Sequence, residues 1–318
     1  MRQEAYFCTV KELDELGKNN IPRQLISHTH LIYSSPATLA FNSPGAEGFG
    51  VKRAGLAVPD SVMLIVSPGC CGRNTSVLSS MRAYQDRFYY LLMDETDIVT
   101  GRHLKKIPKA VAEICEGLKK KPSVVMICIT CVDALLGTDM ERVCHKAEEY
   151  AGVPVRPCYM YALTREGRKP PMVHVRQSVY SLLEPKKKKG NVVNLLGYFS
   201  PLTDDCELYD LLHSAGIKTI HEISRCKDYA QYQTMSEANF NLVLHPEARF
   251  AAEDFHDRLK IPYIELRRLY QIDKIASQYR ALAAALGVEF EDEIPRKAAE
   301  EAVEKFREIH PDAVFAVG

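Results

Sequence analysis

The chain has 318 residues, and 41 lysines and arginines balance 41 aspartates and glutamates. This length accommodates two domains of ordinary size, each with its own hydrophobic core. Because the net charge is zero, no global field attracts nucleic acid or an acidic membrane, and we expect neither as a partner. The N-terminus lacks the apolar core of a signal peptide, and no apolar run approaches the roughly 20 residues of a membrane helix. The sequence therefore predicts a cytoplasmic protein. In that compartment its ten cysteines indicate metal binding, catalysis or burial rather than disulfides.

The first 60 residues lack a clear hydrophobic period, and prolines are expected to interrupt any long element. From Asp60 onward, short apolar runs alternate with amphipathic segments. This alternation is typical of an α/β fold with a mostly parallel sheet. The first half predicts strands at 62–66, 89–93, 123–129 and 153–159, and helices from about 75 and at 105–118, 140–150 and 173–183.

A charged segment with Pro185, four lysines and Gly190 follows. The lysines could bind an anionic partner, but a solvated linker is the simpler interpretation. We place a domain boundary there, between an N-terminal cluster-binding domain (1–188) and a second Rossmann-like domain (189–290). The second domain predicts strands at 191–196, 218–221, 241–245 and 263–265, and helices at 204–215, 236–238, 247–259 and 273–286.

The last segment, 291–318, predicts an amphipathic helix over 295–309 and a strand that starts at Pro311. We interpret it as the start of a third unit that is truncated or completed by another polypeptide.

The first chemical feature is a thiol-bearing turn. The apolar run that starts at Val62 ends at Ser67, and Cys70 and Cys71 follow, flanked by Gly69 and Gly72. A helix is predicted to begin soon after. Unpaired N–H groups and the helix dipole favour anions such as thiolate at such a junction. The turn is therefore a candidate binding site.

A second cysteine ends a later strand. Cys131 follows the apolar run 123–129, so it is expected at the same carboxyl edge of the sheet as Cys71. Two thiolates could then share one metal centre. The spacing of Cys128 and Cys131 also resembles half of a zinc site, although Cys128 is more simply a buried small side chain.

An acidic segment, Asp94-Glu-Thr-Asp97, lies between the two cysteines. It could bind Mg²⁺, or it could be a loop with a helix cap, and its composition does not decide between them.

Three features in this order resemble nitrogenase component 1. They are the strand-Ser-Pro-Gly-Cys-Cys-Gly turn, the Asp94-Glu-x-Asp97-Ile-Val-x-Gly101 segment, and the strand ending in Cys131 with Leu136-Gly-x-Asp139. The similarity runs from about residue 40 to 290. It implies tandem Rossmann-like domains, paired subunits and an iron–sulfur cluster, 4Fe-4S or P-cluster-like, held by cysteines between them.

The resemblance also implies ligands. Cys71 matches the cysteine of the family's Gly-Cys-Gly turn, and Cys131 matches the one that ends the later strand, while Gly69 and Gly72 line the turn. The family's first cysteine would fall near Asn42, where this chain has none. Cys70 is the nearest substitute, Cys8 a remote one, and a partner subunit is another source.

Two departures argue against dinitrogen fixation. The His-Cys pair by which nitrogenase binds its iron–molybdenum cofactor corresponds to His245-Pro246 here, and we expect the family's third domain to be absent after Gly318. Cys226 lies earlier and is interpreted as incidental. The resemblance predicts an oxidoreductase subunit that receives electrons from an ATP-dependent iron-protein-like partner and relays them to an unidentified substrate. The alternatives are a non-catalytic scaffold that builds or carries a metal cluster, and a cluster-free binding protein.

Overall fold

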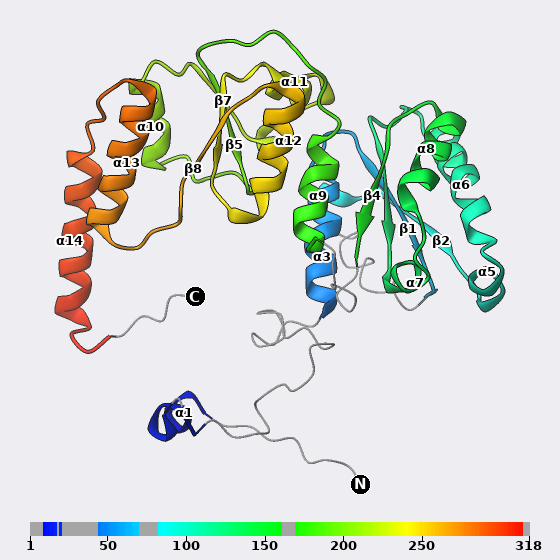
Figure 1. The fold of residues 1–318 in the computed structure, drawn as a ribbon, viewed down its shortest axis with the longest axis horizontal. Coiled ribbons are helices and arrows are strands. Elements are labelled where there is room, and N and C mark those ends of the chain that lie inside the picture. Colours follow the sequence, from blue (N-terminus) through cyan, green and yellow to red (C-terminus); the bar gives the residue numbers. More distant parts are fainter. Residues whose placement is uncertain (1–8, 18, 21–43, 70–81, 161–168, 314–318) are drawn as a thin grey trace.

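The structure, a computed structural model, describes residues 9–17, 19–20, 44–69, 82–160 and 169–313. Two four-stranded parallel sheets form its framework (Figure 1). The first comprises β1 (Val62–Ser67), β2 (Phe88–Leu92), β3 (Val125–Ile129) and β4 (Val155–Tyr159), in the order β2-β1-β3-β4. The second comprises β5 (Val192–Leu196), β6 (Thr219–His221), β7 (Phe240–Val243) and β8 (Tyr263–Glu265), in the order β6-β5-β7-β8.

The α-helices connect and cover these strands. They are α1 (Val10–Leu16), α3 (Pro44–Gly55), α5 (Glu95–Thr100), α6 (His103–Gly117), α7 (Cys131–Leu135), α8 (Met140–Ala151), α9 (Pro171–Tyr180), α10 (Glu207–Ser214), α11 (Tyr229–Gln233), α12 (Arg249–Leu259), α13 (Ile272–Leu286) and α14 (Glu293–Ile309). Short 3₁₀ turns lie at η2 (Arg82–Tyr84), η3 (Ile223–Arg225), η4 (Thr234–Glu237) and η5 (Pro246–Ala248). None of the described helices combines the length and apolar composition needed to cross a membrane.

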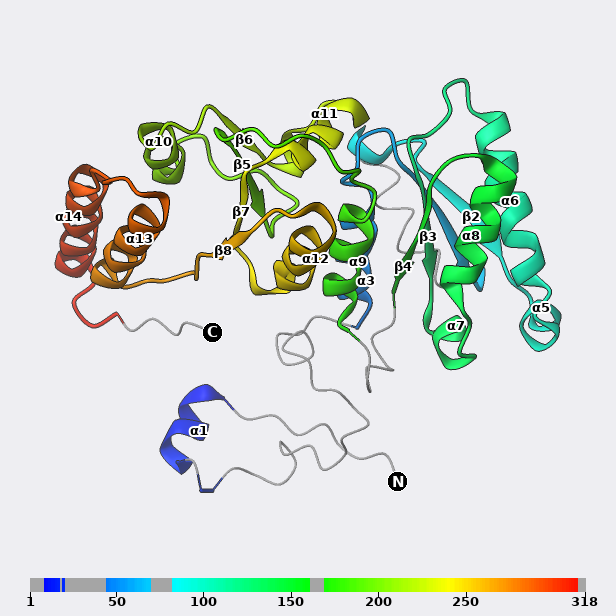
Figure 2. The same cartoon turned by 45° about the horizontal axis from the view of Figure 1, so that its top comes forward.

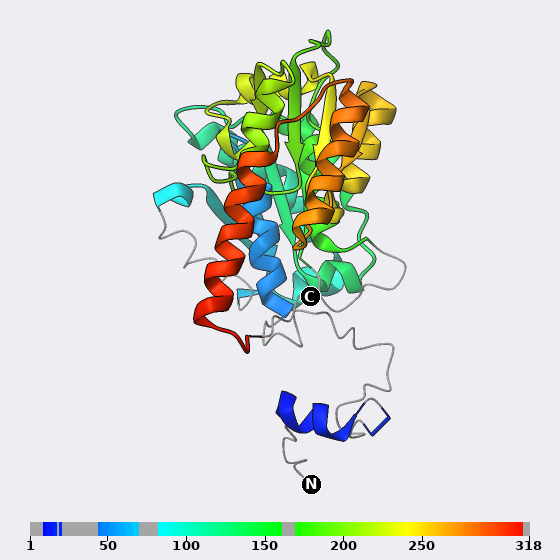
Figure 3. The same cartoon turned by 90° about the vertical axis from the view of Figure 1, so that its left-hand side faces the viewer.

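The elements stack in layers. Helices α6 and α8 cover the outer face of the first sheet, and α3 and α9 cover its inner face (Figures 1 and 2). Helix α12 packs between α9 and the second sheet. Helices α10 and α13 cover the opposite face of that sheet. Helix α14 lies outside α13 (Figure 3).

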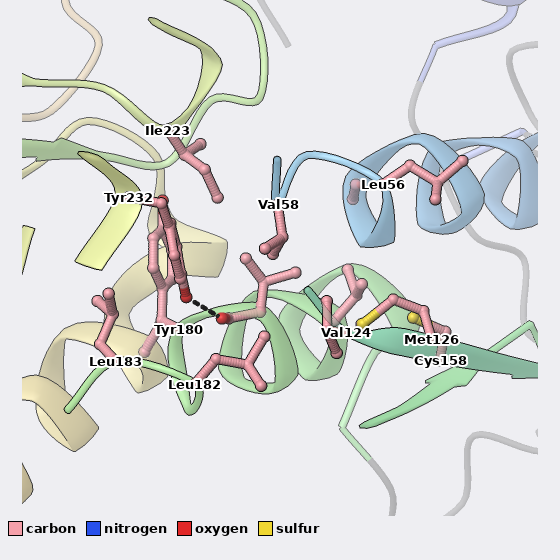
Figure 4. Packing of buried hydrophobic residues seen from close by; sticks show 14 of the residues in the cluster. Leu56, Val58, Val124, Met126, Cys158, Tyr180, Leu182, Leu183, Ile223 and Tyr232 are labelled. Carbon is pink, nitrogen blue, oxygen red and sulfur yellow. Dashed lines mark hydrogen bonds between the residues drawn. The ribbon is translucent and has the colours of Figure 1, made fainter. Parts of the chain in front are cut away.

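One hydrophobic core joins the two sheets. It contains Val58 and Met126 from the first sheet's side together with Tyr232 from the second (Figure 4). Phe255 of α12 belongs to the same core. Tyr180, at the end of α9, packs against Phe255 with ring centroids 5.3 Å apart. The Tyr232 hydroxyl donates a hydrogen bond to the Val179 carbonyl oxygen. Burial of such large side chains is worth ~1.5–3 kcal/mol each, so α9 is fixed firmly between the sheets.

The alternation of side chains along a strand divides the first sheet's residues between two cores. Met63 and Ile65 of β1 belong to the core shared with the second sheet, whereas Leu64 and Val66 pack under α6 and α8. Both β1 and β3 are buried along their whole length, as expected for central strands, whereas β2 at the edge alternates.

The predicted α/β class and the parallel pairing are confirmed, and each of the eight predicted strands overlaps an observed one. The expectation that prolines exclude a long element before residue 60 is wrong. Helix α3 starts at Pro44, because proline fits the first turn of a helix, where its missing N–H costs nothing. The helix predicted at 236–238 is the end of the 3₁₀ turn η4. The helix expected from about 75 and the strand expected after Pro311 lie wholly or mostly outside the described residues.

Candidate metal centre at the carboxyl edge of the first sheet

The first sheet has a topological switch point between β1 and β3. From β1 the chain crosses to β2 on one side, and from β3 it crosses to β4 on the other. Open α/β sheets bind ligands outside the carboxyl ends of the strands at such a point. Helices α5 and α7 lie at this end of the sheet (Figures 1 and 2). Its residues are the natural candidates for a functional site.

Three buried side chains at this edge carry an oxygen atom without a hydrogen-bond partner in the structure. They are Ser67 Oγ at the end of β1, Thr130 Oγ1 just after β3, and Asp133 Oδ2 in α7. The described residues contain seven such side-chain atoms in all, so three are concentrated here. Buried polar groups in native proteins are almost always paired with protein atoms or ordered water, so these three atoms set this edge apart.

The strand register brings two of these oxygens together. Val66 pairs with Ile129, so Ser67 and Thr130 are the next neighbours across the two strands. Both continue the alternation that places Ile65 and Cys128 on the face covered by α3 and α9. The exposed fractions of Ser67 and Thr130 are 0% and 1%. The two hydroxyls are therefore buried at the ends of neighbouring strands.

Cys131 is the described thiol at this edge. It follows Thr130 directly, begins α7 and is part-buried. The sequence prediction that Cys131 emerges at the carboxyl edge is confirmed as a position in the fold, and its role as a ligand stays a prediction. Cys70, Cys71 and Gly72 lie outside the described residues. Gly69 is described and exposed, and a Cβ added there would meet no atom within 4 Å.

The other described cysteines occupy different environments. Four are buried in the cores: Cys115, Cys128, Cys144 and Cys158. Burial raises the pKa of Cys115, Cys144 and Cys158, which keeps these thiols protonated. Cys226 donates a hydrogen bond to the Glu222 carbonyl, and burial raises its pKa to about 11. The burial of Cys128 agrees with the packing interpretation and not with half of a zinc site.

A buried histidine clamps α7 to α5 and α6. His103 Nδ1 lies 3.0 Å from the Asp97 carbonyl oxygen, which can only accept, so Nδ1 carries a proton. His103 Nε2 lies 2.9 Å from Asp133 Oδ1, which also accepts from Thr138. His103 and Asp133 are 1% and 0% exposed. This clamp holds the helix that begins with Cys131, and the sequence analysis missed it because the two residues are 30 positions apart.

The acidic segment forms a helix cap. Asp94 accepts a hydrogen bond from the Asp97 amide at 2.7 Å, and Asp97 accepts one from the Asp94 amide, which is the reciprocal capping box of α5. Asp97 also binds Lys106 and Arg102, each at 2.7 Å. Lys106 first, and then Arg102, lower the pKa of Asp97 to about 2. Because the Asp97 carboxylate is bound by Arg102 and Lys106, the segment caps α5 and is not a Mg²⁺ site.

Exposed apolar side chains surround the same edge. Leu92 ends β2, Val99 lies on α5, Leu135 ends α7 and Leu136 follows it, with exposed fractions of 59%, 85%, 69% and 51%. We call these four residues the apolar rim. Exposed apolar side chains on elements at one end of a sheet suit a surface that binds another protein.

The equivalent edge of the second sheet is filled by the protein itself. Arg176, from α9, donates two hydrogen bonds to the Gly197 carbonyl oxygen after β5 and forms a 2.8 Å ion pair with Glu247 after β7. Burial lowers the pKa of Arg176, and Glu247 partly opposes this. Gly197 has φ +136°, and a Cβ there would lie 2.7 Å from the His245 amide nitrogen, so only glycine fits.

His245 and Pro246 stand at this second edge, where the sequence analysis expected them. The His245 side chain is part-exposed, its Nδ1 accepts from the Glu247 amide, and its ring meets Tyr198 edge-on. Burial lowers its pKa. Pro246 begins η5 and offers no ligand atom in its side chain.

Cys131 offers the ligand type that iron takes in iron–sulfur clusters. Within the described residues, no three His, Cys, Asp or Glu side chains form a metal-binding group. The remaining predicted ligands, Cys70 and Cys71, lie outside those residues.

The fold and this edge define an α/β protein of tandem parallel-sheet units with a candidate metal centre. The family described as nitrogenase component 1 type oxidoreductase matches residues 47–313. The chain belongs to this family, as the sequence analysis predicted from the cysteine turn, the acidic segment and the strand ending in Cys131 taken together.

Similar proteins agree with this assignment. The chain is 28% identical over 239 residues to the nitrogenase iron-molybdenum cofactor biosynthesis protein NifE of Nostoc sp., covering 72% of this chain and 49% of that protein. It is 27% identical over 266 residues to NifE of Klebsiella pneumoniae, covering 77% and 58%. The chain thus spans about half the length of these curated relatives.

A solved structure supports the fold. The chain superimposes on a structure titled nitrogenase Cp1 at pH 6.5 with a TM-score of 0.60 and 19% identity, covering 83% of this chain and 61% of that one. At this identity the likeness shows the fold alone.

Proposed function

We propose that this chain is an iron–sulfur-cluster-binding subunit of a nitrogenase-like complex. Cys131 is the observation that carries the proposal, because its part-buried thiol lies at the switch point beside two unpaired hydroxyls. Cys71 and Cys131 would bind iron, Cys70 would stand in for the cysteine missing near Asn42, and Gly69 and Gly72 would shape the turn. A bound cluster would supply one-electron transfer.

A second subunit would complete the site. The apolar rim beside Cys131 supports this, since a cluster that loses its water contacts on docking is more stable and less open to oxidation. The partner would be a second component-1-like chain or another copy of this one. An ATP-dependent iron-protein-like reductase would deliver electrons to the assembly, as the family membership suggests.

Iron analysis tests the ligand assignment. After anaerobic reconstitution with iron(II) and sulfide, we expect Cys131→Ala and Cys71→Ala to lose most of their iron and to change the EPR spectrum of the reduced protein. Cys226→Ala is the matched control, because Cys226 is also part-buried but hydrogen-bonds to the Glu222 carbonyl in the second unit. Wild-type iron and an unchanged spectrum in both site variants would refute the assignment.

A charge placed on the rim tests the partner. Leu135→Lys should dissociate the cluster-containing oligomer, measured by sedimentation under anaerobic conditions. Ile294→Lys on α14 is the control, because Ile294 is as exposed, at 84%, but lies on another part of the molecule. An oligomer that survives Leu135→Lys would contradict this interface.

The finer role is either electron relay or cluster assembly. The relatives are named as cofactor biosynthesis proteins, and Pro246 replaces the cofactor cysteine, and both observations favour a scaffold that builds or carries a cluster. A scaffold should pass iron to an acceptor apoprotein, whereas a relay should retain it through repeated reduction. A transfer assay with ⁵⁷Fe-loaded protein separates the two roles: retention after ten reduction cycles would exclude the scaffold.

A further inference from the structure

We propose that the groove between α8, β4, α9 and α12 binds a linear polyamine. The groove has a volume of about 340 Å³, and polar side chains make up most of its lining. Neither Cys131 nor any residue of the apolar rim belongs to this lining. The inference therefore goes beyond the proposed function and does not rest on it.

The free edge of β4 forms one wall of the groove. β4 is the last strand of the first sheet and pairs there with β3. The Val155 amide donates to Glu148 Oε1 at 2.9 Å. Pro157 has no amide hydrogen, and its carbonyl oxygen accepts from Ser178 at 2.9 Å. A proline and side-chain partners of this kind block the addition of a further strand, so an occupant of the groove must be held by side chains.

One side of α9 forms the floor of the groove. The lining residues there are spaced by three, one and three positions, so they lie on the same side of the helix: His174, Gln177, Ser178 and Ser181. Seven residues of α-helix rise about 10 Å. Glu141 of α8 and Asp254 of α12 line the groove from elements on opposite sides of α9 (Figures 1 and 2). A ligand that contacts all of these elements is therefore an extended molecule.

His174 provides an acceptor in the groove. The Ser178 hydroxyl donates to Pro157, so its oxygen accepts at 3.3 Å from His174 Nδ1, which then carries the ring proton. Burial lowers the pKa of His174 to about 4, with a smaller contribution from Lys169. The ring is therefore neutral near pH 7, and its Nε2 keeps a lone pair that can accept a hydrogen bond.

Two carboxylates add stronger acceptors. Arg258 contacts Asp254 through Oδ2 at 3.3 Å, which leaves Oδ1 for another donor. Glu141 is exposed at the start of α8. Throughout the described part of the chain, no three His, Cys, Asp or Glu side chains are arranged to hold one metal ion. The acceptors of the groove therefore suit a chain of separate ammonium groups better than a single divalent cation.

The basic side chains at the groove already have partners. Arg156 forms an ion pair with Glu148 and donates to Ser181 at 3.1 Å. Lys169 donates to Gln177 Oε1 at 2.8 Å. The chain itself thus places one ammonium group against the α9 floor, and a polyamine would extend this arrangement to the remaining acceptors.

The test uses the full-length chain without iron, titrated with spermidine in a calorimeter near neutral pH. We expect one site per chain, and we expect Glu141→Gln and Asp254→Asn each to weaken binding by about tenfold, because each removes a charged acceptor. Glu141 is exposed, so its substitution leaves the fold intact. Glu149→Gln is the matched control and should bind as wild type does, because Glu149 is an exposed carboxylate on the same helix but outside the groove.

Two further measurements define the ligand. Hexane-1,6-diol, an extended but neutral molecule, should not bind, and Mg²⁺ at constant ionic strength should not displace spermidine. Because α8 and α12 belong to different units, spermidine should also raise the unfolding temperature of wild type and not that of Glu141→Gln/Asp254→Asn.

The inference would be overturned if wild type failed to bind spermidine, or if wild type, Glu141→Gln and Asp254→Asn bound it equally well. Displacement by Mg²⁺ would overturn it too. Iron plays no part in this test, so its failure would leave the proposed function standing.

Discussion

The two sheets share one topology but treat their carboxyl edges in opposite ways. At the second edge Arg176 fills the switch point, bridges Gly197 and Glu247, and leaves its own donors satisfied. At the first edge the corresponding place holds Cys131 and two unpaired hydroxyls. The edge that Arg176 closes serves the stability of the fold. The first edge is the one where we propose that the cluster binds.

The largest effect is expected at the closed edge. Arg176→Leu leaves the Gly197 carbonyl without its donor and Glu247 without its cation, and we expect the free energy of unfolding to fall by about 3–4 kcal/mol in urea titrations. Arg296→Leu is the control, because the ion pairs of Arg296 with Asp273 and Glu300 are exposed to solvent and should contribute little to stability. If Arg176→Leu loses no more stability than Arg296→Leu, the second edge does not have the structural role that distinguishes it from the first.

The clamp behind the open edge comes next. His103→Leu leaves Asp133 buried without its partner, and we expect a loss of about 2–4 kcal/mol in unfolding free energy. Since Asp133 holds the helix that begins with Cys131, the iron content after reconstitution should fall too. The double variant His103→Leu/Asp133→Leu should recover part of the stability, because no buried charge remains. Equal stability of the single variant and wild type would show that the clamp does not hold α7.

A smaller effect is expected from pH. Burial lowers the pKa of His174, on α9, to about 4, while the unfolded chain titrates near 6.5. The unfolded state therefore binds a proton first as the pH falls, and stability is full above pH 6.5 and decreases from there towards pH 4. Between pH 7 and pH 5 wild type should lose about 1–2 kcal/mol more than His174→Gln in unfolding free energy. Parallel pH profiles of the two proteins would contradict this.

The smallest effect concerns the acidic segment. Asp94→Ala removes the N-cap of α5, which should cost about 1 kcal/mol of unfolding free energy and leave the iron content unchanged. The control is Asp139→Ala, which removes the equivalent cap of α8, where Asp139 accepts from the Arg142 amide. Loss of iron in Asp94→Ala alone would show that the acidic segment contributes to the metal centre.

Hydrophobic patterning predicted the framework of this fold well and the details of its edges poorly. Strands β1 and β3 are buried on both faces, and continuous apolar runs of this kind can be recognised directly in a sequence. Helix α3 was missed because Pro44 suggested a break where it starts a turn. The apolar run before Cys131 predicted its place at the edge, but the pairing state of Ser67 and Thr130 depends on what surrounds them in space. No local pattern encodes it.

The central claim is that iron binds at the first edge and not at the second. It is tested most directly by measuring iron per chain in Cys131→Ala and His245→Ala, reconstituted side by side with wild type under anaerobic conditions. The account predicts that Cys131→Ala loses most of its iron while His245→Ala retains the wild-type amount. The reverse result, with iron lost from His245→Ala and kept in Cys131→Ala, would contradict it.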